Sequence, residues 1–263
     1  MLFRSLEGIQ TLGEGSKGED PNKTGQYGVG FNAVYHLTDV PSFVSQGEEI
    51  GDVLCVFDPH CKYLPGATPS EPGGRFNDTA TLREKFPDIF PCYLSDHFKI
   101  DNATMFRFPL RTQDMARESK ITSNCVSVKE LDFMIEGLKK ELFEVLLFVK
   151  NVRKITLCEV DKADGKLANS YTVEAALSKK DEAKREEFTD YIKQIGKSAK
   201  KRGVIDLRKI PVKKVSYVLN ITDTRGNAEK WLIVQQVGFE KDVDENIIRA
   251  FRKKELGMLP CGG

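Results

Sequence analysis

The sequence predicts an α+β fold, a two-layer sandwich in which helices cover one face of a mixed or antiparallel sheet. Short apolar runs of strand length come first, a segment of helical periodicity follows at residues 127–150, and strand-like alternation then returns. Strands and helices that follow one another without regular alternation are typical of α+β domains. A chain of 263 residues, 40% of them hydrophobic, can bury the core of one large domain or one and a half.

The first half of the chain combines polar loops with short strands. Residues 1–24 turn polar and glycine-rich after a few apolar side chains, which predicts a flexible segment. Strands are predicted at residues 52–57 and 103–110, and a proline late in the second run places that strand at or near a sheet edge. Residues 61–100 are rich in Pro, Gly and Asp and predict a long irregular excursion.

The clearest predicted helix spans residues 127–150. Ser127 and Glu130 match the capping-box pattern at its start. Apolar side chains recur at helical spacing and predict one buried face, made of Leu131, Met134, Ile135, Leu138, Leu142, Val145 and Leu146. Residues 152–160 and 171–176 then predict a strand and its hairpin partner.

A strongly charged segment at residues 179–202 predicts an exposed amphipathic helix with a narrow apolar stripe. Its final basic cluster suits nucleic acid in principle, but acidic residues interleave the segment and favour a solvated helix face. Strands at 215–222 and 230–237 are joined by a turn and predict a hairpin. Residues 244–254 predict a short final helix.

Composition excludes several classes of function. The formal net charge of +1 produces no overall field that would attract nucleic acid or acidic lipid. No apolar run approaches the roughly 20 residues needed to span a bilayer, and the first ten residues do not resemble a signal peptide. Six scattered cysteines form no CxxC pair, and the adjacent His60 and Cys61 are an incomplete ligand set, so we expect no metal site. Reduced thiols and a cytoplasmic location are expected.

The stretch Thr24–His36 carries the strongest functional signal. Gly25, Gly28 and Gly30 open a predicted buried helix on which Phe31 and the residues three and four positions later share one face. Glycine lets the backbone approach another group closely, and free amides at a helix start favour a phosphate. Glycines also serve as turn or close-packing residues, so spacing alone leaves both interpretations open.

The wider sequence around these glycines supplies a resemblance. The run Gly25–Phe31, GQYGVGF, resembles the second glycine box of the GHKL ATPases, which include gyrase, the ninety-kilodalton heat-shock chaperone, histidine kinases and MutL. The longer run GQYGVGFNAVYHLTDVP, with FDPH at residues 57–60 and PGGRF at 72–76, resembles the heat-shock-like repeat of the sacsin family. The resemblance implies the Bergerat fold of the GHKL superfamily.

The resemblance also implies a domain organisation and a binding site. Residues 1–160 correspond to a heat-shock-like nucleotide-binding domain, with residues 1–24 as its lid. Residues 161–263 correspond to a continuation of the repeat, with β-hairpins and a charged amphipathic helix, in the same domain or a second one. In the family, the backbone amides of the glycine box bind nucleotide phosphates. Carried onto this chain, the cofactor-binding residues are Gln26, Tyr27, Gly28, Val29, Gly30 and Phe31.

Two family motifs have no counterpart in this sequence. One is a helix with a water-activating Glu and a magnesium-binding Asn, and the other is an Asp-x-Gly-x-Gly turn that recognises adenine. Both precede the lid in the family, so we expect an N-terminally truncated fragment that lacks ATPase activity, has no catalytic residues and holds no cofactor. ATP and Mg²⁺ are expected only for the intact domain, because phosphoryl transfer needs a metal, a positioned water and held phosphates.

Three functions remain open at this point. The resemblance implies a chaperone or co-chaperone module of a large cytoplasmic quality-control protein, with the heat-shock chaperone machinery, client proteins and intermediate filaments as partners. The alternatives are an ATP-binding domain when intact, and a structural interaction module in which the glycine turn is a relic. A fragment lacking a covering helix exposes apolar surface, so homodimerisation through that surface or by segment exchange is a further expectation. No nucleic-acid or membrane partner is expected.

Overall fold

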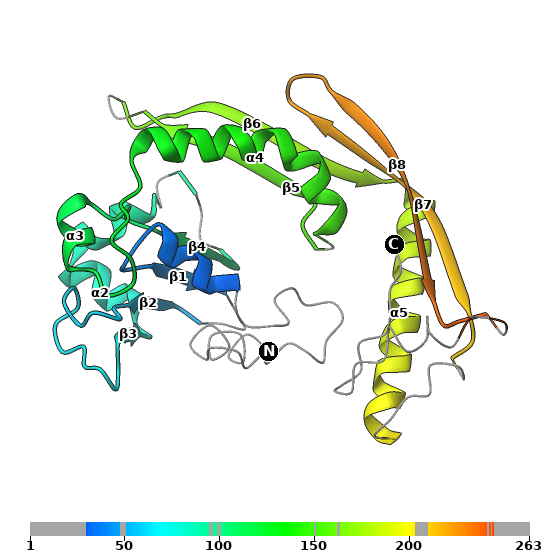
Figure 1. The fold of residues 1–263 in the computed structure, drawn as a ribbon, viewed down its shortest axis with the longest axis horizontal. Coiled ribbons are helices and arrows are strands. Elements are labelled where there is room, and N and C mark those ends of the chain that lie inside the picture. The colour runs from blue at the N-terminus through cyan, green and yellow to red at the C-terminus, as the bar shows by residue number, and fades with distance from the viewer. Residues whose placement is uncertain are drawn as a thin grey trace. The chain divides into compact units, whose positions relative to one another are not determined.

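The computed structural model describes residues 30–47, 51–94, 97–98, 101–149, 151–161, 164–202, 210–240, 242 and 244. In this part of the chain the predicted α+β class is confirmed, since helices accompany two four-stranded antiparallel sheets (Figure 1). The sequence did not show that the strands form two sheets. Contacts divide the chain into two compact units, and the boundary between Glu136 and Gly137 falls inside helix α4 (Val128–Phe148).

The sheet of the first unit has the strand order β3-β2-β1-β4. Its strands are β1 (Ser42–Gln46), β2 (Val53–Phe57), β3 (Gly73–Phe76) and β4 (Ala103–Arg107). The predictions of β2 and β4 are confirmed, and β4 lies at an edge as its proline indicated. Strand β1, which lies between β2 and β4, was not predicted, because its five residues lack the polar–apolar alternation of a half-exposed strand.

The expectation of an irregular excursion over residues 61–100 is wrong in part. This stretch contains β3, helix α2 (Thr79–Lys85) and the 3₁₀ helix η2 (Pro87–Tyr93). Its turn-forming residues begin short elements: Asp78 caps α2 by accepting a hydrogen bond from the Thr81 amide, and a proline opens η2. A Cβ on Gly73 would overlap the carbonyl oxygen of Val56, so glycine is what allows β3 to pair with β2 there.

Both faces of the first sheet are covered. On one face Phe43, Val53 and Cys55 form a buried cluster. The opposite face carries Val44 and Leu54, which pack with two buried aromatic side chains of η2. Neighbouring residues of one strand therefore point into different apolar layers, as the two-residue period of a strand requires. A further short helix, α3 (Gln113–Glu118), was not predicted.

The second unit has one sheet with both long helices on one face. The strand order is β5-β6-β7-β8, with β5 (Lys154–Val160), β6 (Leu167–Leu177), β7 (Lys213–Asp223) and β8 (Ala228–Val237). Helix α4 packs on β6 and β7 through its C-terminal half, and α5 (Lys179–Arg202) packs beside β7. Both predicted hairpins and the charged amphipathic helix are confirmed.

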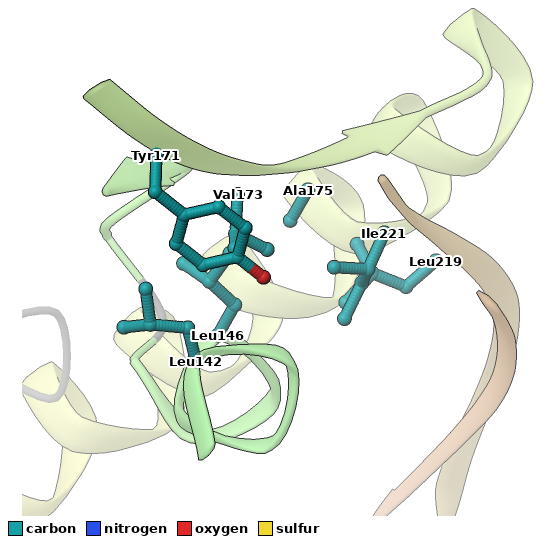
Figure 2. Close-up of a cluster of buried hydrophobic side chains, with 7 residues drawn as sticks. All are labelled: Leu142, Leu146, Tyr171, Val173, Ala175, Leu219 and Ile221. Atoms are coloured by element: carbon teal, nitrogen blue, oxygen red, sulfur yellow. The ribbon is translucent and has the colours of Figure 1, made fainter. Parts of the chain in front are cut away.

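Figure 2 shows the core of this unit. Leu142 and Leu146 of α4 meet apolar side chains of β6 and β7, namely Tyr171, Val173, Ala175, Leu219 and Ile221. The predicted burial of all seven α4 apolar residues is wrong for the first half of the helix, where Met134 and Leu138 are 50% and 39% exposed. The reason is that only the C-terminal half of α4 packs in this core. The predicted helix at 244–254 lies outside the described residues except for Asp244, which is not helical.

Candidate functional site

The glycine box lies at the edge of the described structure. Four of the predicted phosphate-binding residues, Gln26, Tyr27, Gly28 and Val29, fall outside the described residues, as does the lid-like segment 1–24. The other two, Gly30 and Phe31, begin the 3₁₀ helix η1 (Gly30–His36). The predicted helix is therefore present but short, and its apolar face is half-buried.

Phe31 anchors η1 to the first sheet through aromatic contacts. Its ring centroid lies 5.2 Å from that of Phe57 and 6.0 Å from that of Phe106. These distances are typical of packed aromatic pairs. Gly30, one residue earlier, is exposed, and no described atom lies within 4 Å of the position that a Cβ would occupy. Contacts among the described residues therefore do not require a glycine at this position.

A buried arginine holds the other end of η1. Arg111 is 1% exposed and donates from Nη2 to the carbonyl oxygen of Tyr35 at 2.6 Å. It also donates from Nε to Oδ1 of the fully buried Asp39, at 2.7 Å. A third donor, Nη1, reaches the carbonyl oxygen of Asn124 at 3.1 Å. We call Arg111 and Asp39 the buried clamp, because they tie the carbonyl end of η1 to the chain after β4 and to the loop before α4.

Two further polar side chains surround the clamp. Ser119 donates to Oδ1 of Asp39 at 3.1 Å, and Nε2 of the buried His60 lies 3.5 Å from Oδ2 of the same carboxylate. The Ser119 oxygen is also 3.4 Å from that Nε2. A Ser-His-Asp triad needs the serine and the carboxylate on different ring nitrogens, whereas here both face the same one. The arrangement is therefore a packed polar network and not a nucleophilic centre.

Other predicted features of this region have clear positions. Asp58 caps a turn, because its Oδ2 accepts from the amides of Tyr63 and Leu64 at 2.7 and 2.9 Å. His60 contacts the clamp through its Nε2 atom. Within the described ranges, no three His, Cys, Asp or Glu side chains come together as a metal could use them.

Burial controls the reactivity of groups near η1. Desolvation raises the pKa of the Cys55 thiol to about 11, although the nearby Arg75 charge opposes the shift. Desolvation likewise raises the pKa of the Tyr35 hydroxyl. Both groups are therefore neutral at physiological pH, and Cys55 is a packing residue and not a nucleophile. The buried clamp could not be predicted from the sequence, because isolated Arg and Asp residues after apolar segments give no spacing signal.

The second unit contains a hollow of about 1040 Å³ between the end of α4, one side of α5 and strands β7 and β8. Its floor includes Tyr217, Leu219 and Ile233, and Phe148 at the end of α4 is 83% exposed beside it. The α5 wall combines the buried Phe188 and Ile192 with polar side chains, namely Glu182, Arg185, Glu186, Thr189, Asp190 and Lys193. Burial raises the pKa of the Tyr217 hydroxyl. The hollow therefore presents an apolar surface beside charges of both signs.

Together these features define an α+β module with a glycine-box helix fixed on an aromatic layer. The sequence model of the Sacsin domain matches residues 3–172, and the chain belongs to this family. It is 41% identical to human (Homo sapiens) sacsin over 261 residues, which is 98% of this chain and 6% of the human protein. In the described part of the chain, no helix combines the length and the apolar character needed to cross a membrane.

Proposed function

We propose that this chain is a client-binding chaperone or co-chaperone module of a large multidomain protein. The observation that carries the proposal is the hollow of the second unit, where Phe148 and Trp231 line the wall and remain 83% and 39% exposed. Exposed apolar surface of this kind is typical of sites that bind other proteins. Charged side chains of α5 line the same hollow, beside the exposed apolar groups that apolar segments of an unfolded client would contact.

An aggregation assay with a matched pair of variants tests this proposal. Phe148→Asp places a charge in the hollow, and Phe133→Asp makes the same change on the same helix, away from the hollow, where the side chain is 81% exposed. We expect the wild-type chain and Phe133→Asp to suppress aggregation of a denatured client, and Phe148→Asp to lose most of this effect. A wild-type chain without effect, or equal activity of the two variants, would contradict the proposal.

The partners of such a module are proposed from family membership. The heat-shock chaperone machinery, its client proteins and intermediate filaments are the partners that the sacsin resemblance implies. The chain covers 6% of human sacsin, so activities of the whole protein extend to this segment only as proposals. Pull-down with the wild-type chain and Phe148→Asp separates partners that use the hollow from partners that use other surfaces.

A second proposed function is binding of nucleotide phosphate by the glycine box. The observation that favours it is that no described atom lies within 4 Å of a Cβ position at Gly30, so contacts with the described residues do not explain the glycine there. Gly137, inside α4, has equally open surroundings and provides a control position. We expect weak phosphate binding that Gly30→Val abolishes and Gly137→Val preserves, with no ATP hydrolysis. Calorimetric titration of phosphate and of ATP with Mg²⁺, into this chain and into one extended at its N-terminus, measures both effects.

The extended chain is the informative comparison. Binding of ATP with Mg²⁺ by the extended chain alone supports a phosphate cradle that needs the other family motifs. Tight ATP binding by the chain of 263 residues would mean that the two family motifs absent from this sequence are not essential for binding. Phosphate binding that Gly30→Val leaves unchanged would exclude Gly30 from the site.

A further inference from the structure

Strand β8 forms an open edge of the second sheet. It pairs with β7 along its whole length, in an unbroken register from Lys213↔Val237 to Thr222↔Ala228. No other described strand pairs with its second side, since β8 is last in the order β5-β6-β7-β8 (Figure 1). The amide and carbonyl groups on such a side are free to pair with another extended chain.

The two edges of this sheet differ in how well they are protected. At β5, the opposite edge, the register with β6 shifts between Leu157 and Glu159, and charged side chains occur at both ends of the pairing. Bulges and charges of this kind hinder the addition of a further strand. From Trp231 to Val237, β8 has no charge, no proline and no register shift. Leu232 and Val234 are 67% and 49% exposed.

We propose that a second copy of this chain pairs with β8 in antiparallel orientation, so that two sheets join into one. An unpaired strand edge can be satisfied along its length only by another extended segment. The charge distribution selects a second copy in this orientation. Glu229 and Lys230 lie at the start of β8, and the glutamines Gln235 and Gln236 lie near its end.

Antiparallel pairing about a two-fold axis keeps like charges apart. The axis is perpendicular to the sheet, so opposite residues lie on the same face and the centre falls at Leu232 or at Ile233. With Leu232 at the centre, Glu229 lies opposite Gln235, and with Ile233 at the centre, Lys230 lies opposite Gln236. Parallel pairing in register would instead bring each charge beside its own copy, which is destabilising.

A lysine at the centre of the edge tests the proposal. Leu232→Lys places two like charges directly opposite each other if Leu232 is the centre, and diagonally on the same face if Ile233 is the centre, and both arrangements are repulsive. Val218→Lys makes the same change on the directly paired residue of the inner strand β7. By sedimentation between roughly 1 and 100 µM, we expect a concentration-dependent dimer for the wild type and for Val218→Lys. Leu232→Lys should be monomeric throughout this range.

A second variant of opposite charge distinguishes loss of the dimer interface from loss of the fold. Mixing Leu232→Lys with Leu232→Glu should restore a dimer that contains one copy of each, detectable by native mass spectrometry. Hydrogen exchange of β8 amides should be slower in the wild-type dimer than in the Leu232→Lys monomer. A wild-type chain that stays monomeric, or a dimer that survives Leu232→Lys, overturns the proposal. Capture of an unrelated extended peptide by a monomeric wild type would replace the second copy as occupant.

Discussion

The two units of this chain differ in the chemical character of their buried side chains. Every buried polar or charged side chain of the described residues lies in the first unit, namely Thr38, Asp39, Ser42, Ser45, Asp58, His60, Thr79 and Arg111. The buried side chains described for the second unit are all hydrophobic. The first unit thus adds specific pairing between buried polar groups to its apolar layers, whereas the second depends on removing apolar area from water.

This difference determines which substitutions should reduce the stability of each unit most. An apolar core loses stability in proportion to the volume removed, and its neighbours relax in part. A buried ion pair behaves differently, because removing one partner leaves the other charge desolvated and uncompensated. Substitution of either clamp residue, Arg111 or Asp39, should therefore destabilise the first unit strongly. Because Arg111 also binds the carbonyl end of η1, such a substitution should also loosen the attachment of this helix.

The largest effect should come from breaking the clamp. Asp39→Asn keeps the shape of the side chain but leaves the Arg111 charge unpaired, and we expect a loss of about 3–5 kcal/mol from the first unit. Alkylation of Cys55, followed by mass spectrometry, reports opening of this unit because that thiol is buried and its pKa is about 11. Fluorescence of Trp231, the one tryptophan of the chain, reports the second unit.

The Trp231 fluorescence of the Asp39→Asn variant tests whether the two units unfold separately. We expect its denaturant midpoint to stay at the wild-type value while Cys55 becomes reactive at lower denaturant. The exposed Cys92 should react equally fast in both proteins and serves as the internal standard. A parallel loss in both signals would mean that the units unfold together and that the comparison does not describe separate stabilities.

The reciprocal test removes apolar volume from the second unit. Leu142 is fully buried in its core, and Leu142→Ala should cost about 2–5 kcal/mol in the Trp231 transition. Alkylation of Cys55 should remain slow. The matching change on the exposed half of the same helix, Leu138→Ala, should cost much less because that side chain is 39% exposed. Equal losses in the two variants would contradict the assigned packing of α4.

The same contrast explains which parts of the structure the sequence could predict. Periodicity located α4, α5 and the two hairpins of the second unit, because an apolar core with one covered sheet face leaves a regular pattern. The first unit hides that pattern: β1 is buried on both faces, and short elements follow Asp78 and Pro87 inside a stretch that reads as loop. The clamp left no local signal, since Asp39 and Arg111 are 72 residues apart in the chain.

A smaller effect is expected at the start of α4, the element that both units share. Ser127 accepts a hydrogen bond from the Glu130 amide, and Glu130 accepts in return from the Ser127 amide. Ser127→Ala should cost about 1 kcal/mol. We expect the loss in the Trp231 transition, because the buried side chains of α4 belong to the second core. Thermal unfolding of the variant, followed by fluorescence, measures it. A loss confined to Cys55 reactivity would place the helix start with the first unit instead.

The smallest effect is the pH dependence of this cap. The hydrogen bond from the Ser127 amide, with a second from the Ser127 hydroxyl, lowers the pKa of the Glu130 carboxyl below its ordinary 4.5. A lowered pKa means that the stabilisation is complete above the unfolded value and is lost as the pH falls through the folded value. Glu130→Gln retains an acceptor that does not titrate, so between pH 6 and about pH 3 its Trp231 transition should fall less steeply than that of the wild type. Because the carboxyl is exposed, the difference should be small, and parallel curves for the two proteins would show that the ionised cap adds nothing to the second unit.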